Sequence, residues 1–263
     1  PPSRWPGASQ SWLPTIPARF GAGRDPSRQS PYSSPAGNPP SGGRRSGVGW
    51  GRRSFALARK NGDDRPVVFV STGVQAAIGA ADQSDIIWEH FEINMPEGTL
   101  IEKGFQMDDA TRCQAKYIKV NGNTVTTTGN HEAFRIGTGT IAHGTVDCLV
   151  QDCEAYNVRA GASSFNANSA AFKIYAPTRL TIEHCLMVNC DTGIYDKFQT
   201  SFDSVHRRNI IRDCRVPFYT SQVPWTRARI YENICTGYDT SGFVTDLGQG
   251  QWLDDVRFYN NVF

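Results

Sequence analysis

Short segments in which apolar and polar residues alternate recur along most of the chain. Three clear copies are Leu180–Met187, Ile211–Val216 and Ile230–Cys235, and in each an apolar residue lies three places before a Cys or an Asn. Anchored on that residue, seven copies recur at intervals of 32, 30, 32, 29, 19 and 28 residues: Trp88, Val120, Val150, Ile182, Ile211, Ile230 and Phe258. A period of about 20–50 residues is typical of solenoids, arrays and propellers.

The copies have the composition of β-strands. Val, Ile, Thr, Tyr and Phe dominate them, and Gly, Asn, Asp or Pro separates them. No convincing helical period follows residue 85, which disfavours helical repeats. A propeller blade needs about 40 residues, and the Leu-x-x-Leu-x-Leu signature of leucine-rich repeats is missing. The pattern therefore predicts a solenoid of short strands with one coil per repeat.

A second set of segments aligns without gaps: Ala133–Gly137, Ala171–Tyr175, Gly193–Lys197, Pro217–Ser221 and Gly242–Asp246. Side chains alternate between the two faces of a strand. The second residue of each segment is predicted to face inward: Phe134, Phe172, Ile194, Phe218 and Phe243. The third residue is predicted to face outward: Arg135, Lys173, Tyr195, Tyr219 and Val244.

An Asn or a Cys recurs at a fixed turn position after the first strands. Asn233 and Asn261 fit an asparagine ladder, in which side-chain amides pair from coil to coil. Three cysteines are expected in the same column: Cys153, Cys185 and Cys214. These features resemble the right-handed parallel β-helix of the pectate-lyase-like superfamily. The resemblance covers roughly residues 64–263 and implies an all-β solenoid.

The charge is divided unevenly along the 263 residues. Residues 1–60 hold nine Arg, one Lys and one Asp, together with ten of the 15 prolines, so they carry +9 while the rest carries −7. Such a segment buries too little apolar surface to offset its ordering entropy. We expect residues 1–60 to be a disordered linker or an artefact of translation, and residues 61–263 to be a β-helix truncated at its C-terminus. Nucleic-acid binding is disfavoured because the acidic part would repel phosphate.

The sequence gives little indication of membrane or metal binding. No run of 18 apolar residues is present, so we expect no membrane span. The seven cysteines lack zinc-ligand spacing, and we expect buried free thiols, with disulfides as the alternative. Calcium is the metal suggested by the acid pairs Asp108–Asp109 and Asp254–Asp255. Adjacent strand residues point to opposite faces, however, so solvated turn acids are expected instead.

Basic and aromatic residues gather at the outward positions of the second strand set. Guanidinium and ammonium groups pair with carboxylates, and tyrosine rings stack on sugars. We therefore predict that an acidic polysaccharide binds to five residues: Arg135, Lys173, Tyr175, Tyr195 and Tyr219. The segment Gly193–Lys197 also resembles a recurring phrase of β-helix proteins in carbohydrate metabolism. The resemblance implies a lyase or a glycosidase outside the cell or on its surface.

A polyuronide lyase needs a base for the C5 proton and a cation beside the uronate carboxylate. Lys197 is the candidate base, with His206 as the alternative, and Arg212 and Arg208 are the candidate cations. A glycosidase would instead need two carboxylates flanking one bond. The candidates for that role are Glu183, Asp196 and Asp213, although Asp196 is predicted to point inward.

A non-catalytic solenoid is the other hypothesis, either a surface adhesin or a phage tail-spike module. The chain lacks the Asn-Thr-Asp, Asp-Asp, Gly-His-Gly and Arg-Ile-Lys set of polygalacturonases, and the Arg-x-Pro-x-x-Arg stretch of pectate lyases. An enzyme is expected to gather its outward polar groups in one groove, whereas an adhesin spreads them. We expect Arg159–Asn168 to form a wall of such a groove.

Overall fold

The computed structural model describes residues 57–60, 63–69, 76–95, 103–122, 131–137, 144–160, 165–197, 201–221, 225–246 and 252–263. All of them belong to one compact unit, Arg52–Phe263. Every regular element within these ranges is a β-strand, which confirms the all-β prediction. The predicted leader lies outside the described residues, except that a first strand begins at Leu57.

The strands form four sheets, in each of which successive members are hydrogen-bonded neighbours. Sheet 1 contains β1 (Leu57–Lys60), β2 (Asp63–Phe69), β5 (Glu92–Asn94), β8 (Lys119–Asn121), β11 (Glu154–Tyr156), β14 (Leu186–Val188), β18 (Ile210–Arg212) and β22 (Ile234–Thr236). Sheet 2 contains β4 (Ile87–Glu89), β7 (Gln114–Lys116), β10 (Leu149–Gln151), β13 (Thr181–Glu183), β17 (Val205–Arg207), β21 (Arg229–Tyr231) and β25 (Arg257–Tyr259). Sheet 3 contains β3 (Ala76–Ala81), β6 (Lys103–Asp108), β9 (His131–Ile136), β12 (Ser169–Ile174), β15 (Thr192–Lys197), β19 (Val216–Ser221) and β23 (Phe243–Asp246). The short sheet 4 contains β16 (Ser201–Phe202), β20 (Trp225–Thr226) and β24 (Leu253–Asp254).

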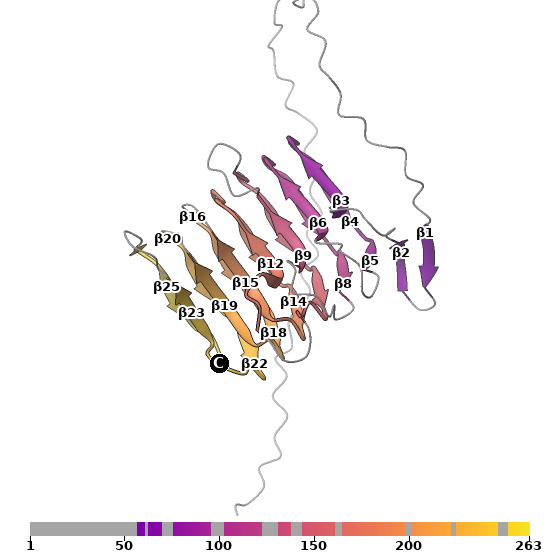
Figure 1. Cartoon of the computed structure of the whole chain (residues 1–263). Helices are drawn as coiled ribbons and strands as arrows, with labels where there is room; N and C mark the ends of the chain where they lie inside the picture. The colour runs from indigo at the N-terminus through magenta and orange to yellow at the C-terminus, as the bar shows by residue number, and fades with distance from the viewer. Residues whose placement is uncertain are drawn as a thin grey trace, which may run out of the picture. The chain divides into compact units, whose positions relative to one another are not determined.

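The chain visits these sheets in a repeating order. The consecutive strands β10, β11, β12 and β13 belong to sheets 2, 1, 3 and 2. Among the described strands every pairing is parallel except that of β1 with β2. Figure 1 shows the strands of sheet 3 following one another in order from β3 to β23. Stacked parallel sheets with this connectivity are consistent with a parallel β-helix.

The strand register of sheet 3 agrees with the gapless alignment of the second segment set. Phe134, Phe172, Ile194, Phe218 and Phe243 are direct neighbours from strand to strand. The first four are fully buried, and the rings of Phe134 and Phe172 stack with their centres 4.6 Å apart. The large apolar side chains of this sheet therefore form one side of the core, as predicted.

The register of the first segment set differs from the prediction. Val120 and Ile211 lie in sheet 1, whereas the other five anchors lie in sheet 2. The true column in sheet 2 has intervals of 27, 35, 32, 24, 24 and 28 residues: Trp88, Ala115, Val150, Ile182, His206, Ile230 and Phe258. Most coils carry two consecutive three-residue strands with an apolar centre and a similar turn, so the sequence pattern alone does not separate them, and His206 takes the central place in β17.

This difference in register also separates the predicted cysteine column. Cys153 and Cys185 follow neighbouring strands of sheet 2, but the next residue in their row is Asn209, whose side-chain oxygen accepts from the Cys185 N–H at 3.0 Å. Cys214 follows a strand of sheet 1 and stands beside Cys190 instead. All seven cysteines are buried free thiols, as expected.

The asparagine ladder is confirmed and is longer than predicted. The side-chain oxygen of Asn233 accepts hydrogen bonds from both the backbone N–H and the side-chain amide of Asn209, each at 3.0 Å. Asn261 accepts from Asn233 in the same way, at 3.0 and 2.9 Å. The ladder thus satisfies polar groups that are buried where the chain turns between sheets 2 and 1.

Residues whose backbone adopts the left-handed conformation, with positive φ, turn the chain where one sheet passes into the next. In one coil these are Asp147, Asp152 and Asn157, with φ of 55, 53 and 57°. Asp and Asn tolerate this region better than most residues. Each donates its N–H to the next coil, to the carbonyl oxygens of Thr178, Glu183 and Val188 at 3.0, 3.2 and 3.0 Å. The corners are therefore fixed by hydrogen bonds between coils.

Candidate functional site

The outward positions of sheet 3 bring most of the predicted binding residues together. Arg135, Lys173, Tyr195 and Tyr219 are direct neighbours on β9, β12, β15 and β19. Tyr175 immediately follows β12, and Lys197 ends β15. We call these six residues the basic–aromatic face: Arg135, Lys173, Tyr175, Tyr195, Lys197 and Tyr219.

Cations and aromatic rings alternate on this face. The Arg135 guanidinium carbon lies 4.5 Å from the centre of the Tyr175 ring. The Lys173 Nζ atom lies 5.7 Å from the Tyr175 ring and 5.9 Å from the Tyr195 ring. Lys197 Nζ also lies 5.7 Å from the Tyr195 ring. Cations at these distances interact favourably with ring faces, so the packing fixes both groups.

Part of the face is more deeply buried than the sequence suggested. The side chain of Lys173 is 1% exposed, and Tyr175 and Tyr195 are buried as well. Lys173 Nζ lies 2.8 Å from Glu132 Oε1, and Arg135 lies 3.5 Å from the same carboxylate. Burying a lysine without a partner would be costly. Lys173 therefore lies at the buried bottom of the face. The members that solvent reaches are Arg135, Lys197 and Tyr219.

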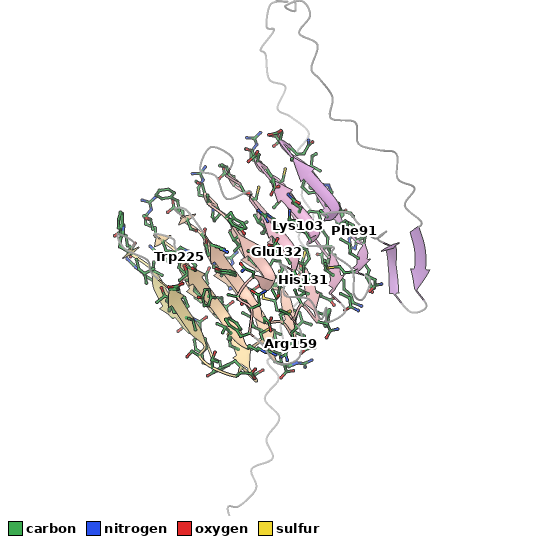
Figure 2. The ribbon with its side chains drawn as sticks, in the orientation of Figure 1. Phe91, Lys103, His131, Glu132, Arg159 and Trp225 are labelled. Atoms are coloured by element: carbon green, nitrogen blue, oxygen red, sulfur yellow. The ribbon has the colours of Figure 1, made fainter. Side chains whose placement is uncertain are left out.

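Glu132 was not predicted from the sequence. It is fully buried on β9, and its partner in the strand register is Lys103 of β6. Both residues are labelled in Figure 2. The available signal was its place three residues before Arg135, on a strand whose neighbour supplies Lys173. The gapless alignment already gave the pairing of β9 with β12, but strict alternation would place Glu132 on the inward side with Phe134. The alternation breaks here, since Ala133 and Phe134 are both buried.

Lys197 is the one predicted catalytic residue that lies on this face. It is half-buried, and its Nζ donates a hydrogen bond to Asn168 Oδ1 at 2.8 Å. Burial and the nearby Lys173 charge lower the pKa of Lys197 below its usual value. Burial raises the pKa of Tyr195 to about 12 and also raises that of Tyr219, so both hydroxyls keep their protons at neutral pH.

The other three catalytic candidates lie elsewhere. Arg212 is an exposed residue of sheet 1, 3.4 Å from Asp213. Arg208 lies at the corner between sheets 2 and 1, where it pairs with Glu232 at 2.7 Å. His206 faces the interior, fully buried, with its ring 6.1 Å from that of Trp225 and its pKa lowered by burial to about 4. The structure does not bring these residues to Lys197.

The glycosidase candidates are dispersed in the same way. Asp196 points into the core, as alternation predicted, and burial raises its pKa to about 7. Glu183 is in sheet 2 and pairs with Arg207 at 2.5 Å. Asp213 follows a strand of sheet 1. No two of these three carboxylates share a strand column.

The segment expected to form a groove wall is described at both of its ends, with residues 161–164 outside the described residues. At its start, Arg159 donates to the Asp213 carbonyl oxygen at 2.7 Å. At its end, the exposed Phe165 ring lies 6.2 Å from the Tyr219 ring, and Asn168 contacts Lys197. The end of the segment, from Phe165 to Asn168, therefore borders the basic–aromatic face.

Comparisons with family models, curated proteins and solved structures gave no match to this chain. Within the described ranges, no three His, Cys, Asp or Glu side chains are grouped so that they could hold a metal ion. The same ranges contain no helix that could cross a membrane.

Proposed function

We propose that the basic–aromatic face binds an acidic polysaccharide and that the protein is a lyase. The observation that carries this proposal is the packing of three cations against tyrosine rings on one face, where Lys197 is half-buried. Cations recognise uronate carboxylates, and aromatic faces suit sugar rings. We also propose the finer fold assignment, a right-handed parallel β-helix like that of the pectate-lyase-like superfamily.

The proposed reaction is β-elimination. Lys197, in its neutral form, takes the proton from C5 of a uronate, and the electrons of that bond form the C4–C5 double bond as the C4–oxygen bond breaks. Arg135 takes over the role first given to Arg212 and Arg208, because it lies on the same face and neutralises the substrate carboxylate. Tyr219, which solvent reaches on the same face and which is protonated at neutral pH, protonates the leaving oxygen.

The test is an ultraviolet assay for unsaturated uronate products on pectate, alginate and glycosaminoglycans. Lys197→Met keeps the aliphatic stem and removes the amine, so it should lower kcat by roughly 10²–10⁴-fold. Lys116→Met on sheet 2 is the matched control and should leave kcat unchanged. A wild-type protein that forms no unsaturated product from any of these polymers would refute the lyase assignment.

A non-catalytic binding module is the second candidate. Its supporting observation is the burial of Lys173 with Glu132, which gives part of the face a structural role. This function predicts salt-sensitive polysaccharide binding that Arg135→Ala weakens, without any product. Both functions place the protein outside the cell or on its surface. The dispersed carboxylates disfavour a glycosidase, which needs two of them around one bond.

A further inference from the structure

Asp191 joins the two ends of the segment that borders the basic–aromatic face. It lies in the corner just before β15, and its side chain is fully buried. One carboxylate oxygen, Oδ2, accepts hydrogen bonds from the backbone N–H groups of Ala160 at 2.8 Å and Asn166 at 3.3 Å. The other oxygen lies 3.3 Å from Arg215 Nη1. A buried carboxylate is retained at such a place only when it is paired and hydrogen-bonded.

The contacts continue from Asn166 to Lys197. The Asn166 side-chain oxygen accepts from the Asn168 N–H at 3.0 Å, and its carbonyl oxygen accepts from the Ser169 N–H at 2.8 Å. The hydroxyl of Thr192, next to Asp191, donates to the Ala167 carbonyl oxygen at 3.4 Å. Asn168 then presents its side-chain oxygen to Lys197 Nζ at 2.8 Å. The chain of contacts runs without a break from a buried carboxylate to the proposed base.

We propose that Asp191 is a positioning residue, which fixes Asn166 and thereby holds Asn168 against Lys197. The importance of this for catalysis rests on the proposed lyase function, but the positioning itself does not. The ionisable groups that act on Lys197 from neighbouring strands are Lys173, Glu132 and Arg135. Asn168 supplies a neutral acceptor on the side of the bordering segment, and so orients the ammonium group without neutralising it.

The first test needs no activity. The rate at which acetic anhydride labels Lys197 is measured by mass spectrometry from pH 7 to 10 in the wild type and in three variants: Asp191→Asn, Asn168→Ala and Asp239→Asn. Releasing the amine should raise its labelling roughly two- to tenfold in the first two, as expected for the loss of one hydrogen bond. Asp239 is the control, because it pairs with the same Arg215 at 3.6 Å but is exposed and contacts no atom of this chain of bonds.

Unchanged labelling of Lys197 in either Asp191→Asn or Asn168→Ala would overturn the proposal. Should Asp191→Asn fail to fold, amide hydrogen exchange of the wild type tests the hydrogen bonds to Asp191 instead. The backbone amides of Ala160 and Asn166 should be protected, and exchange at the rate of a free peptide at either position would overturn the proposal. If the wild type is an active lyase, Asp191→Asn should lower kcat about tenfold at unchanged KM. A wild type without activity, but with the expected labelling, refutes the proposed function and leaves the positioning supported.

Discussion

Replacement of Asp196 by Asn should make the protein more stable at alkaline pH but not at acidic pH. Asp196 lies inside the stack, between Ile174 and Thr220 of the neighbouring strands, and its side chain is fully buried. Burial raises its pKa from 3.8 to about 7, although the nearby polar groups of Ser201 and Trp225 partly oppose this. Asn has nearly the same shape and cannot ionise, so it removes the titration and preserves the packing.

The sign and size of the effect follow from proton linkage. The folded state holds the Asp196 proton up to about pH 7, whereas the unfolded chain releases it near pH 3.8. The favourable contribution is therefore fully present below pH 3.8 and is lost as the pH rises to about 7. The difference between these two pKa values corresponds to roughly 4 kcal/mol of stability, as an upper bound.

The assay is urea unfolding of the wild type and Asp196→Asn at intervals from pH 4 to pH 8. His206 acts in the opposite direction, because burial lowers its pKa from 6.5 to about 4 and stability is lost as the pH falls through that range. Its contribution is common to both proteins and cancels in the difference. We expect little difference at pH 4 and an advantage of up to about 4 kcal/mol for Asn at pH 8. A difference that does not change with pH would refute the reasoning.

Two further predictions concern the buried thiols and the asparagine ladder. All seven thiols should resist a thiol reagent at pH 8 in the folded protein and react on unfolding, because they are buried. Burial also raises the pKa of Cys148 to about 11 and that of Cys235 to about 12. Fast labelling of the folded state would contradict their placement. Asn233→Ala should destabilise the protein by roughly 2–4 kcal/mol, because it leaves the buried backbone N–H of Asn209 without its acceptor. The exposed Thr236→Ala should cost less than about 0.5 kcal/mol in the same unfolding experiment.

The corner residues were less predictable than the strands. One corner column alternates in charge over seven coils: Asp85, Arg112, Asp147, Arg179, Asp203, Arg227 and Asp255. Within it, Arg112 pairs with Asp85 and Arg227 with Asp203 through two hydrogen bonds each. The two residues of a pair are separated by 24 to 32 positions, a number that differs from coil to coil. The pairing can therefore be recognised only once the register of the coils is known.

The amino-acid sequence by itself determined that the chain is built of short strands and, in sheet 3, on which side of the strand most side chains lie. In sheet 3 the alternation of Phe172 with Lys173, or of Ile194 with Tyr195, was sufficient, because those strands are long enough for alternation to define one register. Most strands of sheets 1 and 2 have only three residues, and such short strands do not reveal which strand neighbours which. That pairing was decided by the tertiary structure.

The same limit applies to the candidate site. The sequence located Lys197 and the tyrosines, since they lie on strands whose register it could predict. It grouped His206, Arg208 and Arg212 with them only because they are near in the chain, whereas a coil places consecutive strands on different sheets. Glu132, Asn168 and Asp191 became visible through contacts across coils. Residues far apart in the chain meet here because each turn of the stack returns the backbone to the same face one strand further along.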